Sequence, residues 1–381
     1  MPDVDAPKVL QIIHNLKQEG AQRVMVNLAL HLPDLGWSAL VHPWRKGGPF
    51  LRTLLEAGVP VDGPPPTRRS VPGALAHMVR LCREHDVRII HAHQVDGAVL
   101  GALLSWRCGL PLVITHHSTR ILPHSASLLH KALHTPAYRL AARRASVNAA
   151  VSADVATYAA EQLALPPGRM TVVPNGVPVG DEPGPWRPTS PPRLLIIGRL
   201  NSIKGQIQMV EALPALRARW PGLTVRMVGD GSRADSLRAR AAELGVADAL
   251  DLAGLVEDVT GELRAADLLV STSHYEGAPM GILEAMGQGV PVVASDVPGT
   301  RAVVRPGETG RLYPLHDISA LVDAITAALN GPEETALMAR IAWRETAERS
   351  SCSAMTRAYV RLYQDCLCVP TATAARAPSA P

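Results

Sequence analysis

Short apolar runs alternate with amphipathic segments along most of this chain. The runs are rich in Val, Ile and Leu and end at turn residues, as expected for strands that a parallel sheet buries on both faces. The segments between them repeat apolar residues roughly every three or four positions, which is the spacing of one helix face. The alternation predicts an α/β protein with doubly wound parallel sheets.

The predicted elements form two series. Strands of the first series are predicted at Lys8–Ile13, Ser38–His42, Ile89–His91, Leu112–Thr115 and Val147–Val151. Its helices are predicted at Ala21–Leu32, Leu51–Ala57, Leu75–His85 and Ala98–Arg107. Strands of the second series are predicted at Arg193–Ile197, Thr224–Val228, Leu250–Ala253, Leu268–Ser271 and Pro291–Ala294. Its last helices are predicted at Ile318–Leu329, Glu333–Arg349 and Ala354–Leu367.

A proline-rich break separates the two series. Residues 178–192 (PVGDEPGPWRPTSPP) contain six prolines and two glycines, a composition typical of a linker and not of a packed element. A chain of 381 residues also exceeds one ordinary core. We therefore predict an N-terminal domain over 1–177, a C-terminal domain over 193–350, a final helix over 351–368 and a disordered tail over 369–381.

Composition and charge argue against a nucleic-acid partner. The chain is 47% hydrophobic and 19% charged with a formal net charge of +4, so it is globular and only mildly basic. Basic residues alternate with acidic ones, and neither zinc-finger spacing nor an aromatic-plus-basic RNA motif occurs. No binding to DNA or RNA is therefore expected.

The chain is expected to be cytoplasmic. Its five cysteines are scattered and odd in number, which suits free thiols in a reducing compartment better than a disulfide framework or a metal cluster. The N-terminal segment is acidic and its apolar run is short, unlike a signal peptide. The longest apolar stretch, Ala98–Trp106, is far shorter than the roughly 20 residues that a membrane span needs.

The segment Ser271–Gly299 carries a pair of carboxylates. Glu276 and Glu284 are eight positions apart and bracket a loop that leads into a helix. Gly277 permits a close backbone approach, and Pro279 suits the first helical turn. Free backbone amides at a helix N-terminus bind anions, so we expect the amides to face phosphate and the carboxylates to face neutral hydroxyls. An anion flanked by hydroxyls indicates a nucleotide sugar.

Two cations follow the first strand of the C-terminal series. Arg199 comes just after the strand, and Lys204 precedes Gly205 and a helix. Arginine offers a planar fork for phosphate oxygens and lysine a compact charge. They could be ordinary surface cations, but their position at the carboxyl end of a buried parallel strand favours phosphate binding.

The segment RMVGDGSRA resembles a dinucleotide-binding pattern in spacing. Gly229, Gly231 and Ala234 stand at the required positions, and Asp248 or Asp251 lies about 20 residues further on. That pattern usually opens its domain, whereas this strand is the second of its series. A tight turn lining a nucleotide cleft is therefore favoured over NAD binding. A second turn, the Asn-Gly of VVPNGV, marks the junction between the domains.

Histidines gather at predicted strand ends of the N-terminal series. They are His14, His91, His93, His116 and His117. The pair His91 and His93 could chelate a metal, since both face one side of a strand, but the nearest acid is Asp96 and no ligand spacing accompanies them. A histidine that hydrogen-bonds a substrate is favoured over a metal site.

Taken in order, these motifs resemble those of the retaining GT-B glycosyltransferases of family 4. The shared segments are the loop near Gly20, ITHHST, VVPNGV, GRLNSIKG, MVGDG, LAGLVEDV, the E-x7-E segment and GVPVVASDVPG, which together span nearly the whole chain. Several short motifs in the right order are more specific than any one of them. The resemblance implies a GT-B fold, with two doubly wound Rossmann-like domains facing a cleft and the C-terminal helix crossing back to the first domain.

The resemblance also implies residues that hold a nucleotide-sugar donor. Arg199 and Lys204 correspond to the residues that bind the donor diphosphate. Glu276 corresponds to the glutamate that contacts the transferred sugar, and Glu284 to the one that contacts the ribose. Further donor contacts are implied for Gly20, Val256, Gly277, Gly281 and Ile282.

One ambiguity and two departures concern the same site. The histidine beside the donor sugar corresponds to His117, although the doublet leaves His116 open. The family's first loop often reads Gly-Gly where this chain has Glu19-Gly20, and a carboxylate would repel a diphosphate, so Glu19 is expected to face the acceptor or solvent. The family's later Gly-Gly-x-x-Glu is replaced here by 298–301, Pro-Gly-Thr-Arg.

The implied activity is sugar transfer with retained anomeric configuration. The donor is a nucleotide sugar, predicted to be UDP-linked, which carries a hexose or N-acetylhexosamine and acts as co-substrate, so no separate cofactor is implied. The family has no secure protein nucleophile, and stabilisation of the leaving diphosphate is its favoured account. Metal-dependent glycosyltransferases of the other major fold usually carry an Asp-x-Asp triplet in mid-chain. The only such triplet here is Asp3-Val4-Asp5 at the terminus, so no catalytic metal is expected.

The same residues bear on other activities and on the acceptor. An epimerase or phosphorylase on the same fold and a non-catalytic scaffold are disfavoured by the E-x7-E segment together with GRLNSIKG. The acceptor is a small molecule or a lipid-linked glycan. The basic segment Leu128–Arg144 suits either peripheral contact with an anionic membrane or a solvated helix packed on its own domain, and the second is favoured.

Overall fold

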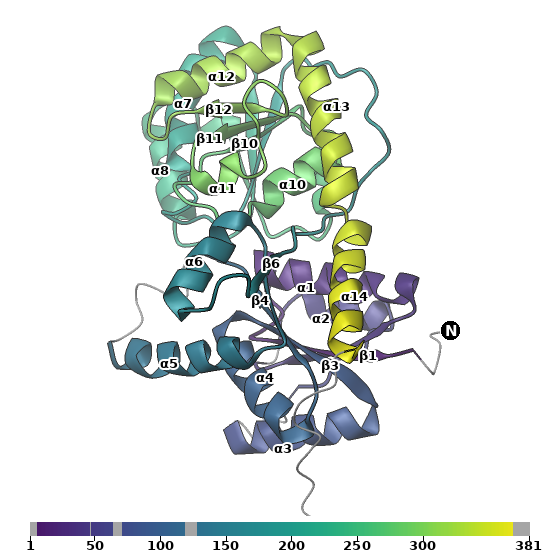
Figure 1. Ribbon diagram of the computed structural model, residues 1–381. Helices are drawn as coiled ribbons and strands as arrows, with labels where there is room; N and C mark the ends of the chain where they lie inside the picture. The colour runs from purple at the N-terminus through teal and green to yellow at the C-terminus, as the bar shows by residue number, and fades with distance from the viewer. Residues whose placement is uncertain (1–5, 46, 64–70, 119–127, 369–381) are drawn as a thin grey trace, which may run out of the picture. The chain divides into compact units, whose positions relative to one another are not determined.

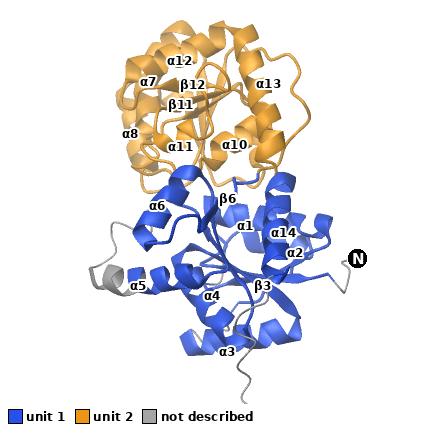
Figure 2. Cartoon of the chain, viewed as in Figure 1, with its two compact units in different colours: residues 1–176, 352–381 blue, residues 177–351 orange. Residues whose placement is uncertain are grey.

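The computed structural model describes residues 6–45, 47–63, 71–118 and 128–368 (Figure 1). The chain forms two compact units (Figure 2). Unit 1 comprises residues 1–176 and 352–381, and unit 2 comprises residues 177–351. The tail predicted to be disordered, 369–381, lies outside the described residues.

Unit 1 is built on a parallel six-stranded sheet in the order β2-β1-β3-β4-β5-β6. Its strands are β1 Lys8–Ile13, β2 Ser38–Pro43, β3 Val87–His93, β4 Leu112–His116, β5 Val147–Ala150 and β6 Met170–Val172. Its α-helices are α1 Gly20–His31, α2 Phe50–Glu56, α3 Val71–Glu84, α4 Gln94–Cys108, α5 Leu128–Arg144, α6 Ala153–Leu163 and α14 Cys352–Cys368.

The switch point of the unit 1 sheet lies at β1, where successive strand connections lead to opposite sides. The chain passes from β1 to β2 on one side and later to β3 on the other side of β1. In open parallel sheets, ligands bind outside the carboxyl ends of the strands at such a switch point. This edge of unit 1 carries His14 after β1, His93 at the end of β3, and the doublet 116–117 at the end of β4.

The last helix, α14, packs on unit 1, which confirms the predicted return of the C-terminal helix to the first domain. Its inner face is made of buried residues that include Tyr359 and Tyr363. The ring of Tyr363 lies 5.4 Å from the ring of Trp37. The backbone N–H of Gly176 donates to the sulfur of Met355 at 3.1 Å. These apolar and polar contacts anchor α14 in unit 1.

Unit 2 has the sheet order β12-β11-β10-β7-β8-β9, also parallel throughout. Its strands are β7 Arg193–Ile197, β8 Thr224–Val228, β9 Leu250–Gly254, β10 Leu268–Ser271, β11 Val292–Ser295 and β12 Arg311–Tyr313. Its α-helices are α7 Ile207–Arg219, α8 Ala234–Glu243, α9 Val259–Arg264, α10 Met280–Gly287, α11 Pro298–Arg301, α12 Ile318–Asn330 and α13 Pro332–Arg349. The switch point lies between β7 and β10.

The proline-rich stretch 178–192 contains neither helix nor strand, but it is held on unit 2. The indole N–H of Trp186 donates to the backbone oxygen of Asp267 at 3.1 Å. The backbone N–H of Thr189 donates to the carboxylate of the same aspartate at 2.8 Å. Trp186 also packs against the core of unit 2. The predicted linker is thus bound to the surface of this unit along part of its length.

The α/β class and the two Rossmann-like sheets are confirmed. Strands β1, β7, β8 and β10 have the predicted bounds. Strand β12 was not predicted, because three residues give too short an apolar run. Helix α10 begins at Met280, so Pro279 is its N-cap and does not lie in the first turn as expected. Within the described ranges, none of the helices has the length and apolar content that crossing a bilayer requires.

Candidate active site

The loop after β7 places two cations at the switch point of unit 2. It begins at Gly198, which has φ +152°, and continues to the exposed Arg199. Lys204 is held by its backbone: its N–H donates to the side-chain oxygen of Asn201 at 3.0 Å, and its carbonyl accepts from the Thr272 hydroxyl at 2.9 Å. The loop is therefore tied to the end of β10 and not only to its own strand.

Gly205 is required where this loop turns into α7. Its φ is +61°, a conformation that L residues with side chains rarely adopt. A Cβ at this position would lie 2.4 Å from the backbone oxygen of Thr272 and 2.7 Å from Nε2 of His274. The absence of a side chain lets the β7 loop approach the β10 loop, which sets the position of Lys204.

Lys204 and Glu276 form an ion pair across the two loops. The Lys204 Nζ lies 2.5 Å from Glu276 Oε1, and the side chains are 27% and 10% exposed, respectively. The hydroxyl of Ser273 donates to the same carboxylate oxygen at 2.6 Å. The sequence motifs predict separate roles for the two charged residues, and the structure brings them into direct contact.

Backbone packing fixes the Glu276 loop from behind. A Cβ on Gly299 would lie 2.1 Å from the backbone oxygen of Glu276, so only glycine allows this approach without a shift. The Ser295 hydroxyl donates to the backbone oxygen of Ser273 at 2.5 Å. The Thr300 hydroxyl in turn donates to the backbone oxygen of Ser295 at 2.6 Å. The Pro-Gly-Thr sequence at 298–300 thus supports the glutamate loop through its glycine and its hydroxyl.

Helix α10 starts directly after this loop. Its first turn carries no acidic side chain, so its backbone amides form a positive end toward the loop. Gly281 lies against β7, where an added Cβ would be 3.4 Å from Ile197. Ile282 and Glu284 are buried, and Glu284 is only 6% exposed. Gly277 is half-buried in the loop before the helix.

The glycines of the β8 turn support the cation loop. A Cβ on Gly229 would lie 2.1 Å from the backbone oxygen of Gly198, and one on Gly231 would lie 2.2 Å from that of Leu200. These glycines therefore permit close contact between two neighbouring loops, which accounts for their spacing without a bound dinucleotide. Val256, from the loop after β9, is half-buried and packs against the core beside these strands.

The aspartates that could serve a dinucleotide are engaged elsewhere. Asp248 pairs with Arg217 at 2.6 Å, and Asp251 pairs with Arg226. Arg226 also pairs with Glu262, at 2.6 Å. Both aspartates therefore pair with arginine at the surface, and their position needs no bound dinucleotide to explain it.

At the switch point of unit 1, a hydrogen bond joins the loop after β1 to the first turn of α4. His14 Nδ1 lies 2.7 Å from Asp96 Oδ2, and both side chains are about one third exposed, at 32% and 34%. Gly20 is the exposed first residue of α1, and Glu19 is its N-cap. The loop is braced by Gln22, whose amide donates to the side-chain oxygen of Asn15 at 2.9 Å.

The two histidines of the doublet have different environments. His116 is buried, its Nδ1 bonded to the Tyr138 hydroxyl at 2.6 Å and its Nε2 to Asn148 at 3.1 Å. His117 is half-buried, and its Nε2 lies 3.0 Å from His93 Nδ1. Both nitrogens of His116 are therefore used inside the unit, whereas His117 lies at the edge of the sheet.

His91 and His93 each have two partners within the protein. His91 bonds the hydroxyls of Tyr363 and Thr115, both at 2.7 Å. His93 bonds His117 and, at 2.8 Å, Gln11. Burial lowers the pKa of His91 to about 3 and that of His93 well below its ordinary value, so both are neutral. Among the described residues, no three His, Cys, Asp or Glu side chains are grouped as metal ligands.

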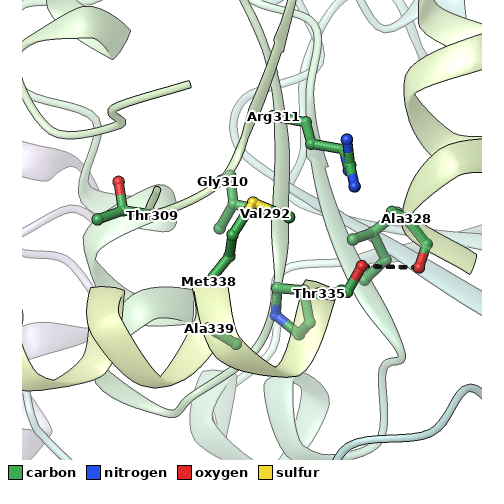
Figure 3. Close-up of a pocket in the computed structure, with 10 residues that line it drawn as sticks. Val292, Thr309, Gly310, Arg311, Ala328, Thr335, Met338 and Ala339 are labelled. Carbon is green, nitrogen blue, oxygen red and sulfur yellow. Dashed lines mark hydrogen bonds between the residues drawn. The ribbon is translucent and has the colours of Figure 1, made fainter. Parts of the chain in front are cut away.

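A small cavity lies away from this site, in unit 2 (Figure 3). It is lined by the first residues of three strands, Leu268, Val292 and Arg311, and by α13, where the Thr335 hydroxyl donates to the backbone oxygen of Ala328 at 2.8 Å. The cavity thus lies at the amino ends of the strands, whereas Lys204 and Glu276 lie past the carboxyl ends. It is therefore not part of the candidate site.

Residue patterns along the chain did not single out Ser273, Gln11 or Tyr363. Ser273 stands three positions before Glu276, and such close spacing is common for hydroxyls that bond a carboxylate. Nothing local marks Gln11, whose partner is 82 positions away, or Tyr363, whose partner is 272 positions away. Only the sheet order and the return of α14 bring these groups together.

The sequence matches known families on both sides of residue 180. Residues 184–345 match the model of the glycosyl transferases group 1, and residues 19–180 match that of glycosyltransferase family 4. The D-inositol 3-phosphate glycosyltransferase of Thermobispora bispora is 32% identical over 294 residues, covering 68% of this chain and 68% of that protein. A glycogen synthase of Mycobacterium tuberculosis is 30% identical over 261 residues, covering 67% of this chain but only 63% of that protein.

Solved structures agree on the fold. The Anabaena protein HepE, crystallised in complex with UDP, has a TM-score of 0.79 and 23% identity, covering 94% of this chain and 100% of that chain. Two Rossmann-like units, each matched by a glycosyltransferase family model, define a GT-B glycosyltransferase. The chain belongs to the glycosyl transferases group 1, within glycosyltransferase family 4.

Proposed function

We propose that the protein transfers a hexose or N-acetylhexosamine from a UDP-sugar to a hydroxyl of its acceptor, with retention of anomeric configuration. The observation that carries the proposal is the ion pair of Lys204 with Glu276 at the switch point of unit 2. Arg199 stands exposed on the same loop as the lysine, and the glutamate loop leads into the amide-rich start of α10. UDP is chosen as the nucleotide because HepE was crystallised with it.

Through this ion pair, the loops after β7 and β10 can serve both the diphosphate and the sugar of a donor. A diphosphate carries more negative charge than one carboxylate, so it competes with Glu276 for Lys204. Once the lysine binds the phosphates, Glu276 is left as an acceptor for sugar hydroxyls. Ser273 keeps that carboxylate in place during the exchange. The buried Glu284, in the second turn of α10, is assigned to the ribose hydroxyls.

Charge development on the leaving group gives these residues their catalytic role. As the glycosidic bond breaks, negative charge grows on the departing diphosphate. Arg199, Lys204 and the first amides of α10 stabilise that charge, which lowers the barrier more than it tightens the ground state. Attack by the acceptor on the same face of the sugar retains the configuration. No protein nucleophile is assigned.

Unit 1 is assigned to the acceptor side. Its switch-point edge presents His117, the His14–Asp96 pair and the start of α1 at Gly20. His117 is assigned to the donor sugar in preference to His116, because both nitrogens of His116 are already bonded inside the unit. The backbone at Gly20 is assigned to the diphosphate, and Glu19 to the acceptor or solvent.

The acceptor is a small molecule or a lipid-linked glycan in this proposal. Two basic residues in the second half of α5 bind carbonyl groups of the protein, so their presence does not require a membrane. Arg139 donates to the backbone oxygen of Gln162 at 2.9 Å, and Arg143 donates to that of Ala164 at 3.1 Å. Both carbonyls lie at the end of α6, where cations stabilise a helix. Peripheral membrane contact therefore stays an additional hypothesis, and we place the protein in the cytoplasm.

A donor screen tests the proposal. The purified protein is mixed with UDP- and GDP-sugars, with and without inositol phosphates, glucans and lipid-linked glycans, and products are read by mass spectrometry. Slow release of UDP without acceptor and a new glycoside with it support the proposal, and NMR of the anomeric proton reads the configuration. EDTA is expected to leave the rate unchanged. A changed sugar still on its nucleotide would indicate an epimerase, and no release from any donor would indicate a scaffold.

A further inference from the structure

A buried chain of hydrogen bonds ends at His117. Gln11 on β1 and His93 at the end of β3 are both completely buried, at 0% exposure. Gln11 Oε1 lies 2.8 Å from His93 Nε2, and His93 Nδ1 lies 3.0 Å from His117 Nε2. The chain Gln11–His93–His117 therefore runs from the interior of the sheet to its carboxyl edge.

The direction of each hydrogen bond follows from the first acceptor. An amide oxygen can only accept, so His93 Nε2 carries a proton. Burial lowers the pKa of His93 well below its ordinary value, so its ring is neutral. Its Nδ1 therefore carries no proton and offers a lone pair. That lone pair must accept from His117, which places the His117 proton on Nε2. Burial lowers the pKa of His117 to about 3, so its other nitrogen, Nδ1, carries no proton.

The Gln11 amide lies with its oxygen toward His93. Its nitrogen is buried and has no hydrogen-bond partner among the described residues. A reversed amide would reverse every later bond.

We infer that Gln11 and His93 are positioning residues that hold His117 in its Nε2–H tautomer and leave Nδ1 as a hydrogen-bond acceptor. The group that such a nitrogen recognises is a hydroxyl, which can donate, and not a phosphate oxygen, which cannot. This rests on the proposed function for the identity of the hydroxyl as one of a sugar or acceptor. The tautomer itself does not depend on that function.

The tautomer is measured directly by NMR. Protein labelled with ¹⁵N at histidine gives long-range ¹H–¹⁵N correlations at pH 7, and the His117→Asn variant assigns the His117 signals. We expect an unprotonated Nδ1 and a protonated Nε2. A proton on Nδ1, or a doubly protonated ring, would overturn the inference without any measurement of activity.

Matched variants separate positioning from packing. Gln11→Met removes the acceptor at similar size, and we expect a mixture of His117 tautomers. Thr115→Val is the control. Thr115 bonds His91 and Tyr359 in the same buried layer, but it is not one of the hydrogen-bonded residues Gln11, His93 and His117. Should Gln11→Met keep the parent tautomer, Gln11 does not set it.

Kinetics then connect the tautomer with turnover. In Gln11→Met we expect kcat to fall about tenfold while UDP affinity is unchanged, because the loss concerns a bond to a hydroxyl. Equal losses in Gln11→Met and Thr115→Val would indicate a packing effect and contradict the positioning role. If no variant or parent shows transfer but the tautomer is as expected, the proposed function fails and the positioning stands.

Discussion

Units 1 and 2 each contain a parallel sheet with one switch point, but the residues at that point differ in kind. In unit 2 the edge is charged: Arg199 is exposed, and Lys204 pairs with Glu276 at the surface end of the loops. In unit 1 much of the edge rests on buried imidazoles, of which His91 and His93 are 0% exposed and neutral. The same topology thus supports an ionic site and a hydrogen-bonding site.

Desolvation explains the difference between the two edges. A charge that keeps some contact with water can still bind a charged ligand, and its solvation loss is moderate. A fully buried group must be neutral or closely paired. Phosphate recognition is therefore suited to the loops of unit 2, and recognition of neutral hydroxyls to the edge of unit 1. The predictions below test that division.

The largest expected effect is a selective loss of stability of unit 1 in acid. Burial lowers the pKa of its histidines, to about 4 for His42 and His116 and about 3 for His91 and His117. An unfolded histidine takes up a proton near pH 6.5, so the stability that depends on neutral histidines is complete above that pH. It is lost as the pH falls toward 4 for His42 and His116 and toward 3 for His91 and His117. Each histidine costs about 1.4 kcal/mol per pH unit in that range.

Hydrogen exchange with mass spectrometry measures this for each unit. We expect protection factors at pH 5 to fall sharply for β3 and β4, and much less for β7 and β8. In unit 2, the histidine with a lowered pKa is His274, because of burial and the neighbouring His316. Parallel loss of protection in both units, or full protection of unit 1 at pH 5, would contradict the selective dependence of unit 1 on neutral buried histidines.

Removal of the lysine should cause the largest loss of ligand binding. In Lys204→Ala the diphosphate loses charge-assisted hydrogen bonds and meets an unpaired Glu276, so we expect UDP to bind roughly 100-fold more weakly. Isothermal titration calorimetry measures the affinity. Arg238→Ala, which removes an exposed cation paired with Asp235 on α8, is the matched control and should bind normally. Equal affinity in Lys204→Ala and the parent protein would refute the phosphate assignment.

The glutamate should affect turnover and spare nucleotide binding. In Glu276→Gln the sugar loses a charged acceptor, and kcat is expected to fall roughly 30-fold. UDP affinity should stay the same or rise, because the competitor for Lys204 is gone. Ser273→Ala, which removes one hydrogen bond to the same carboxylate, should lower kcat roughly threefold. Steady-state kinetics and calorimetry separate the two readouts, and weaker UDP binding in Glu276→Gln would count against the exchange of partners.

The smallest expected effect is at the aspartate of the dinucleotide-like pattern. Asp251 pairs with Arg226 at the surface, so in Asp251→Asn we expect UDP affinity and kcat to stay within about twofold of the parent. A large loss of UDP affinity or kcat, or binding of NAD by the parent protein in the same titration, would instead support dinucleotide binding at this turn.

The sequence alone determined the elements and the identity of the charged residues. Period and run length place strands such as β7 and β10, because a strand buried on both faces must be continuously apolar. Motifs such as GRLNSIKG and E-x7-E name Arg199, Lys204, Glu276 and Glu284, since the chemistry of phosphate and hydroxyl binding is local to each loop. Their assigned roles remain predictions.

Only the tertiary structure decided which of these groups meet. The contact of Lys204 with Glu276 joins positions 72 apart, and it depends on the sheet order that places β10 beside β7. The distinction between His116 and His117 depends on Tyr138 and Asn148, and the chain from Gln11 to His117 depends on the adjacency of β1, β3 and β4. Such pairings are long-range, and no local pattern encodes them, because a side chain's partners are set by packing and not by its neighbours in sequence.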